Sequence, residues 1–303
     1  MRIVSLLPSA TEILFALGAA EQVVGVTHEC DFPAEATAKP QLTASALPHA
    51  GTPAEIDRHV RASVHAGSSL YALDAARLDA LAPDLIVTQE LCAVCAVSYA
   101  IVADAVRRSS ADPRIVSLEP STLEDVYGTI ETLGKLIGAQ ANAVALIARL
   151  RARITQLEAR VANRPRPRTL VLEWTDPPMS GGHWTPGLVE IAGGTPLLAN
   201  PGANSRVIGW DEIGAADPDR VIVAPCGFGM ETTLRAIGAI SDPVWKALRA
   251  QREGQVVAID GNAYVNRPGP RLVDSAELFA LAIHPALRPA YPFTELAYTV
   301  VRA

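Results

Sequence analysis

The first 26 residues constrain the fold most strongly, because they carry a complete β-α-β pattern. Residues 2–7 form a short apolar run that ends at a proline, as is typical of a buried strand. Ser9 and Glu12 have the spacing of a capping box, and apolar residues then recur at helical spacing until Gly18. Residues 23–26 read Val-Val-Gly-Val and indicate a second strand. The pattern predicts an α/β fold.

Several classes of protein are excluded by composition and by the position of the first strand. That strand begins at residue 2, so no room is left for a signal peptide ahead of it. We therefore expect a cytoplasmic location for the chain as it stands, and a periplasmic or other extracytoplasmic one if translation starts upstream. No uncharged apolar stretch approaches the roughly 20 residues of a membrane helix. A net charge of -6 argues against a nucleic-acid partner.

A repeated phrase indicates two lobes of similar plan. Residues 82–87 (Ala-Pro-Asp-Leu-Ile-Val) and 217–223 (Asp-Pro-Asp-Arg-Val-Ile-Val) share a proline, an aspartate and a branched apolar run. In each, the proline closes a helix and the run enters a parallel sheet. A further strand follows each phrase, at 115–118 and at 256–259, and residues 168–174 match the opening strand. We predict two Rossmann-like lobes with parallel sheets.

A long helical stretch separates the two lobes. Apolar residues alternate at spacings of three and four, with a break expected at Gly138 and a second run from 144 to 161. We expect the arginines of this second run to form a solvated face. The predicted organisation is an N-terminal lobe at 1–120, a long rigid connecting helix at 121–163 and a C-terminal lobe at 164–303.

Candidate functional residues gather in five loops. In open parallel sheets, ligands bind beyond the carboxyl ends of the strands. The loops that follow the predicted strands contain all four cysteines, two of the six histidines and two of the four tryptophans. We predict that they form one ligand site between the lobes. The candidate ligand-binding residues are His28, Glu29, Asp31, Gln89, Glu90, Cys92, Trp174, His183, Trp184, Cys226, Tyr264, Asn266 and Arg267.

Some of these residues allow other interpretations. Cys92 and Cys95 have the spacing of a redox pair or of half a zinc site, but no second Cys-x-x-Cys exists, so packed or ligand-facing thiols are favoured. His28 beside Glu29 and Asp31 fits either a metal corner or a hydrogen-bonded loop. No serine-nucleophile elbow, phosphate-binding loop or His-Glu-x-x-His motif occurs, so we expect no enzyme, no intrinsic cofactor and no metal site.

Taken together, these residues resemble the cobalamin and iron-siderophore binding family of ABC-importer substrate-binding proteins, over nearly the whole chain. Within it, residues 88–95 and 173–178 resemble the cobalamin-binding branch. The resemblance implies a helical-backbone fold of the class III periplasmic-binding-protein type. The strongest matching segments are 3–12, 24–27, 83–85 and 268–271.

The resemblance also implies a function. It is non-catalytic binding of a cobalamin-type corrinoid in the cleft between the lobes, by an importer component or a soluble relative. Aromatic cleft positions of the family's vitamin B12 binders fall at or near Glu29, Gln89 and Tyr264, and a polar one falls near Arg267. Two aromatic positions are therefore polar here, and the two tryptophans of the predicted site are the candidates to supply apolar faces instead.

A permease is the implied protein partner of a chain that we expect to be a monomer. The family presents one acidic residue per lobe to the permease. In the second lobe Asp211 or Glu212 fits this role, whereas the matching position of the first lobe is Ala76 and Asp74 is the nearest acid.

Two other functions stay open. One is binding of haem or a ferric siderophore, ranked lower because the cleft loops hold few basic residues besides Arg206, Arg267 and Arg271. The other is a cytosolic metal- or thiol-dependent enzyme or sensor. It would use Cys92, Cys95, Cys226 and His28.

Overall fold

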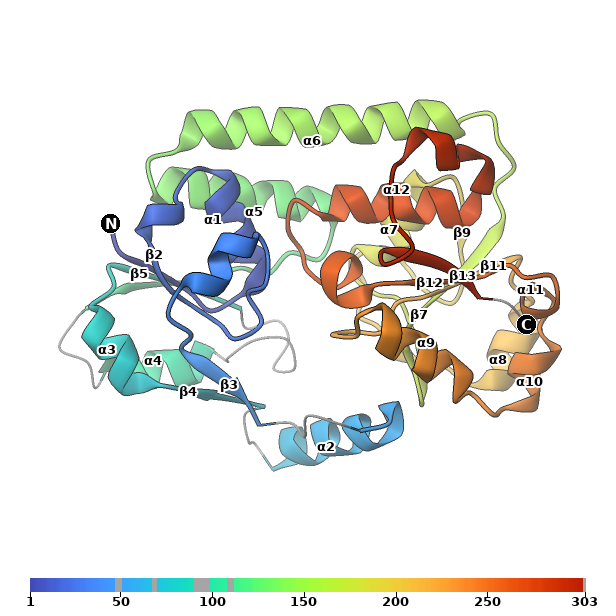
Figure 1. Cartoon of the computed structure of the whole chain (residues 1–303), viewed down its shortest axis with the longest axis horizontal. Coiled ribbons are helices and arrows are strands. Elements are labelled where there is room, and N and C mark those ends of the chain that lie inside the picture. Colours follow the sequence, from blue (N-terminus) through green and yellow to red (C-terminus); the bar gives the residue numbers. More distant parts are fainter. Residues whose placement is uncertain (47–50, 67–69, 90–98, 108–111, 302–303) are drawn as a thin grey trace. The chain divides into compact units, whose positions relative to one another are not determined.

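The chain folds into two compact units, each with a sheet between helices, parallel in unit 1 and mixed in unit 2 (Figure 1). The computed structural model describes residues 1–46, 51–66, 70–89, 99–107 and 112–301. Unit 1 comprises residues 1–120 and 125–148, and unit 2 comprises residues 121–124 and 149–303. The α/β class with two lobes, predicted from the repeated phrase, is confirmed.

Unit 1 is built on a four-stranded sheet in the order β2-β1-β5-β6, with all neighbours parallel. The strands are β1 (Ile3–Ser5), β2 (Val23–Val26), β5 (Leu85–Thr88) and β6 (Arg114–Ser117). A separate antiparallel pair consists of β3 (Thr43–Ser45) and β4 (Tyr71–Leu73). The helices are α1 (Pro8–Ala16), α2 (Pro53–His65), α3 (Ala75–Leu81), α4 (Tyr99–Arg107) and α5 (Leu123–Leu136), with short 3-10 turns at Ala20–Gln22 and Ala34–Ala38.

The capping box predicted at Ser9 and Glu12 is wrong. Helix α1 begins at Pro8, and its N-cap is Leu7, whose side chain makes no capping hydrogen bond. The fixed φ of proline suits the first helical position, so Pro8 sets the start and Ser9 lies inside the first turn. The hydroxyl of Thr11 donates instead to Ser5 Oγ, 2.8 Å away, and joins the helix to β1.

Unit 2 is built on a larger mixed sheet in the order β10-β8-β7-β11-β12-β13, with β9 beside β7. Its centre is parallel, since β7, β11 and β12 run together, while β8 and β13 are antiparallel to their neighbours. The strands are β7 (Arg168–Thr175), β8 (Pro178–Ser180), β9 (Thr195–Pro196), β10 (Arg206–Val207), β11 (Arg220–Val223), β12 (Val256–Ile259) and β13 (Tyr298–Val301).

Helices cover both faces of this sheet, with α7 and α12 on one side and α8, α9 and α10 on the other (Figure 1). Their bounds are α6 (Gln140–Val161), α7 (Thr185–Ile191), α8 (Trp210–Ala216), α9 (Met230–Gly238), α10 (Pro243–Ala247), α11 (Arg249–Arg252) and α12 (Leu272–Ile283), with single turns at Gly261–Val265 and Pro285–Ala290. No helix within the described ranges is long and apolar enough to cross a membrane.

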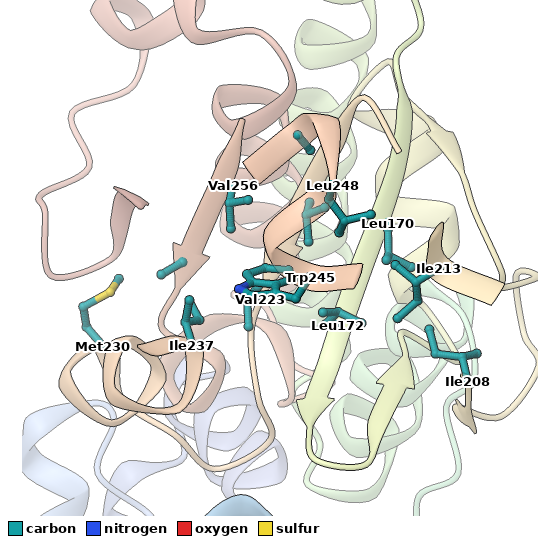
Figure 2. Packing of buried hydrophobic residues seen from close by; sticks show 13 residues of the cluster. Leu170, Leu172, Ile208, Ile213, Val223, Met230, Ile237, Trp245, Leu248 and Val256 are labelled. Atoms are coloured by element: carbon teal, nitrogen blue, oxygen red, sulfur yellow. The ribbon is translucent and has the colours of Figure 1, made fainter. Parts of the chain in front are cut away.

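The hydrophobic core of unit 2 follows the alternation of its strands. Leu170, Leu172 and Val223 point to the same face, where Trp245 of α10 and Ile213 of α8 pack against them (Figure 2). Trp245 is 3 % exposed and lies with its ring 5.9 Å from that of Trp210, so both act as packing residues. Because alternate side chains of a strand point to opposite faces, Val171, Ile222 and Val257 lie on the opposite face of the sheet.

The connecting stretch is broken where the sequence predicts. Gly138 has a φ of +73°, a left-handed conformation that glycine adopts without strain, and it separates α5 from α6. The solvated arginine face predicted for α6 is wrong at Arg153. This side chain forms ion pairs with Asp274 (2.5 Å) and Glu277 (2.7 Å) of α12. Burial lowers the pKa of the Arg153 guanidinium, but these hydrogen bonds outweigh burial and the net shift is upward.

The repeated phrase makes the same contact in both units. In unit 1, the carboxylate of Asp84 accepts a hydrogen bond from the backbone N–H of Arg2 at 2.6 Å. In unit 2, the carboxylate of Asp219 accepts one from the backbone N–H of Arg168 at 2.7 Å. Each aspartate also donates its own N–H to the carbonyl of the same arginine, at 2.8 Å in both units. Each aspartate therefore ties the start of the second central strand to the start of the first.

We expect Asp84→Ala to lower the free energy of unfolding by about 1 kcal/mol, because the Arg2 amide loses a charge-assisted hydrogen bond. Urea unfolding followed by circular dichroism measures the change. Glu131→Gln removes an exposed ion pair with Lys135 and serves as the control, with an unchanged midpoint expected. Equal stability of Asp84→Ala and wild type would contradict this role of the aspartate.

Stability should also fall in mild acid because of His284, which ends α12 and is 7 % exposed. Burial lowers its pKa, and the charges of Arg164, Arg220 and Arg166 lower it further. The neutral ring is therefore favoured in the folded state. The neutral His284 ring contributes fully to folding stability above a pH of about 6.5. This contribution is lost as the pH falls from there through the lower pKa of the folded state.

We expect His284→Gln to flatten the dependence of the melting temperature on pH between about pH 7 and pH 5. Exposed His65 provides the matched control, because His65→Gln should leave the wild-type slope unchanged. An identical slope in wild type and His284→Gln would show that His284 is not the titrating group.

Candidate functional site

The loops after β7, β11 and β12 meet at the carboxyl edge of the unit 2 sheet. The rings of Trp174 and Phe228 lie 5.0 Å apart between centroids, which joins the first two loops. The N–H of Cys226 donates to the carbonyl of Glu173 at 3.1 Å. The N–H of Asn262 donates to the carbonyl of Phe228 at the same distance and joins the third loop. We call this set of loops the unit 2 edge.

Trp184 belongs to the same edge through its indole. It precedes α7, and its Nε1–H donates to the carbonyl of Val265 at 2.8 Å, so the start of α7 is tied to the loop after β12. The neighbouring His183 has a φ of +51°, and its N–H donates to the carbonyl of Ala203 at 2.6 Å. The rings of His183 and Trp184 lie 5.6 Å apart, and both retain partial exposure.

Glu173 organises the segment that carries these two rings. Its Oε1 accepts hydrogen bonds from the N–H of Gly182 (3.2 Å) and the hydroxyl of Thr185 (2.7 Å). Its Oε2 accepts from the hydroxyl of Ser205 at 2.5 Å. One carboxylate thus holds the turn after β8, the first residue of α7 and the segment before β10. Burial raises the pKa of Glu173, although all three hydrogen bonds oppose that shift.

Gly182 lies where no other residue fits without movement. A Cβ there would sit 2.2 Å from the backbone nitrogen of Ser205, so a side chain would displace that segment. The missing side chain of Gly182 therefore allows two backbone segments to approach each other closely beside Glu173.

Tyr264, Asn266 and Arg267 come from the loop after β12. The ring of Tyr264 contacts Phe293 edge to face, with centroids 6.1 Å apart, and burial raises the pKa of its phenol. Asn266 donates to the carbonyl of Ala224 at 3.2 Å. Arg267 is 6 % exposed and donates to Asn262 Oδ1 at 2.9 Å. Asn266 and Arg267 therefore support the loop from within.

Trp174 also differs from the cleft-facing position predicted for it. It is 8 % exposed, its ring packs on Phe228, and its Nε1–H donates to the carbonyl of Asp176 at 3.1 Å. The ring turns towards the interior at the strand end, because Phe228 offers it an apolar neighbour. Cys226, one loop away, is an exposed free thiol.

The candidate residues of unit 1 follow β2 and β5. His28 Nδ1 lies 2.7 Å from the hydroxyl of Thr43, and its ring centroid is 5.8 Å from that of Tyr71. The hydroxyl of Tyr71 donates to Glu29 Oε1 at 3.2 Å. Asp31 is exposed, whereas Gln89 is 4 % exposed. His28 and Glu29 thus belong to a hydrogen-bonded loop, one of the two alternatives open from the sequence.

Glu90, Cys92 and Cys95 lie outside the described residues. Cys30 is a buried free thiol, with its Sγ 3.1 Å from the hydroxyl of Thr11. Among the histidines, cysteines and acids that the structure describes, no group of three could hold a metal ion.

The predicted docking acids differ in their surroundings. Asp74 caps α3, with its carboxylate accepting from the N–H of Arg77 at 2.9 Å. Glu212 is held by an ion pair with Arg206, and their hydrogen bond lowers the pKa of the Glu212 carboxyl. Asp211 is exposed in the first turn of α8.

Sequence reasoning missed residues outside the five loops that hold the candidate residues of each unit in place. Ser205 precedes an edge strand of only two residues, and no motif marks it. Thr43 and Tyr71 lie on the short β3–β4 pair, which periodicity does not reveal.

The chain belongs to the periplasmic binding protein family, whose model matches residues 3–263. The resemblance inferred from the sequence is confirmed at this level, and so is the class III fold. This is a family of substrate-binding proteins rather than enzymes.

Three similar proteins illustrate the family. The chain is 23 % identical over 290 residues to the uncharacterized ABC transporter substrate-binding lipoprotein YvrC of Bacillus subtilis (strain 168), covering 94 % of this chain and 80 % of YvrC. A periplasmic heme binding protein from Pseudomonas aeruginosa superposes with a TM-score of 0.72 at 21 % identity, covering 100 % and 99 % of the two chains. The periplasmic vitamin B12 binding protein BtuF of Vibrio cholerae gives 0.66 at 20 %, covering 95 % and 98 %. At these identities the two structures show a shared fold.

Replacing Glu173 should separate its acceptor role from its charge. Glu173→Ala leaves three donors without an acceptor, and we expect a loss of about 2–4 kcal/mol in the free energy of unfolding. Glu173→Gln keeps one acceptor oxygen and gains an N–H for Ser205, so we expect a smaller loss. Urea unfolding at pH 5 and pH 8 measures both.

The raised pKa of Glu173 also predicts how the free energy of unfolding depends on pH. Because the folded state favours the neutral carboxyl, wild type loses stability as the pH rises from about 4.5 through the raised value, whereas Glu173→Gln does not. The free energy of unfolding of Glu173→Gln, relative to that of wild type, should therefore be higher at pH 8 than at pH 5. The opposite order would contradict a raised pKa.

Proposed function

We propose that this protein is the substrate-binding component of an ABC importer and that its ligand is a cobalamin-type corrinoid. Membership of the periplasmic binding protein family and similarity to an ABC transporter substrate-binding lipoprotein support the general role. The observation that carries the choice of ligand is the chemistry of the unit 2 edge, where partly exposed rings stand beside neutral polar groups.

The rings suit a large flat ligand. Trp184, His183 and Tyr264 keep part of their surface exposed, while Trp174 and Phe228 form a buried apolar support. Ligand sites in proteins combine such apolar surface with a few placed polar groups. A corrin macrocycle offers broad faces to the rings and an amide-bearing rim to backbone and hydroxyl groups.

The charges favour a corrinoid over haem or a ferric siderophore. Anionic ligands are best held by guanidinium groups that face them. The three arginines expected near the ligand are engaged within the protein: Arg267 with Asn262, Arg206 with Glu212, and Arg271 with the ring of Tyr264 at 5.8 Å. Haem is the second candidate, since a heme binding protein has the same fold.

We further propose an extracytoplasmic location and a permease partner. The relatives provide no support for the cytoplasmic location expected from the early first strand. Of the three acids considered for docking, Asp211 has the most open position, because Asp74 caps a helix and Glu212 is paired.

Hydroxocobalamin should bind with one-to-one stoichiometry in isothermal titration calorimetry and raise the melting temperature by mass action. We expect Tyr264→Ala to weaken binding roughly tenfold through loss of ring contact, and the matched variant Tyr264→Phe to stay within about twofold of wild type. Haem titrated in parallel decides between the candidates. Tighter binding of haem would transfer the proposal to haem, and heat signals absent for both would refute it.

A further inference from the structure

The contacts around His28 determine which ring nitrogen carries the proton. Its backbone N–H lies 3.2 Å from Thr43 Oγ1, and its ring Nδ1 lies 2.7 Å from the same oxygen. An N–H group can only donate, so the first contact uses one lone pair of the hydroxyl. The hydroxyl proton and the second lone pair remain for the ring.

Only one arrangement satisfies the hydroxyl. Thr43 is 8 % exposed, and within the described part of the chain its hydroxyl contacts no group other than these two atoms of His28. If Nδ1 carried the proton, the hydroxyl would accept twice and its own proton would be buried without an acceptor, which is costly. If the hydroxyl donates to Nδ1, the hydroxyl, Nδ1 and the backbone N–H of His28 are all satisfied. The proton of the neutral ring then resides on Nε2.

We infer that His28 is a ligand-binding residue that donates a hydrogen bond through Nε2–H, and that it is not an axial ligand of a metal. A protonated ring nitrogen has no lone pair for cobalt or iron. What it recognises is an acceptor oxygen on the rim of the ligand: an amide carbonyl of a corrinoid or a carboxylate of haem. This assignment of a binding role rests on the proposed function.

The surroundings hold the ring in position. The ring of Tyr71 lies beside it at 49° between planes, and the hydroxyl of Tyr71 donates to Glu29 Oε1. His28 itself is partly exposed, and Nε2 has no partner among the residues that the structure describes. The β3–β4 pair, which supplies Thr43 and Tyr71, therefore engages Nδ1 and leaves the N–H of Nε2 available to a ligand.

The first arm of the test needs no ligand. Long-range ¹⁵N–¹H spectra of the whole chain at pH 8.5, where neutral imidazoles are observed, distinguish a protonated from an unprotonated ring nitrogen. We expect His28 to show Nε2–H, with Thr43→Ser retaining that form and Thr43→Val losing its dominance. His59 is an internal reference for the other tautomer. Its Nδ1 lies 3.3 Å from the carbonyl oxygen of Glu55, which can only accept, so Nδ1 carries the proton in that contact. An Nδ1–H form of His28 would overturn the inference.

The second arm uses hydroxocobalamin and haem as probes. We expect His28→Ala to bind the preferred probe about five- to tenfold more weakly and His28→Gln, which keeps an N–H donor, to stay within about threefold. The visible spectrum of the bound probe should be the same in wild type and His28→Gln. A band shift that only wild type shows would indicate coordination to the metal and would overturn the inference, as would unchanged affinity of His28→Ala.

The two arms fail separately. If wild type binds neither probe, the proposed function is refuted and the binding role of His28 goes with it, while the spectra still decide the tautomer. If wild type binds and His28→Ala binds equally well, the proposed function stands and this inference alone is refuted.

Discussion

The alignment of strand starts by an aspartate is the contact on which both units depend. Asp84 and Asp219 each join two central strands at their amino ends, using the carboxylate and the backbone N–H together. Since parallel strands that start level also end close together, the loops after them gather at one edge. A contact at the amino ends of the strands thereby determines where the loops at their carboxyl ends lie.

The unit 2 edge shows how such loops become a defined surface. Glu173 draws three segments onto one carboxylate, and the backbone of Gly182 approaches Ser205 so closely that no side chain fits. The rings of His183 and Trp184 are positioned by this network rather than by packing in the core. Burial makes the carboxylate costly, and its hydrogen bonds offset part of that cost.

The fold could be predicted from the sequence far better than the site. The β-α-β start, the repeated Pro-Asp phrase and the break at Gly138 are local signals, and each has a counterpart in the structure. Loops at strand ends could be located for the same reason. The direction of a side chain could not be predicted, because it depends on distant partners: Trp174 packs on Phe228, and Arg153 pairs with Asp274 and Glu277 of α12.

Helix α6 has a consequence for dissecting the molecule. Its first nine residues belong to unit 1 and the remainder to unit 2, and residues 121–124 join unit 2 although they precede the rest of it. No single cut therefore yields two intact halves. A fragment that begins at Arg168 would keep the whole sheet of unit 2 but lose Arg153, leaving Asp274 and Glu277 of α12 as adjacent like charges without their cation. Because α6 carries residues of both units, the sequence cannot be divided at one point even though each unit has its own main sheet.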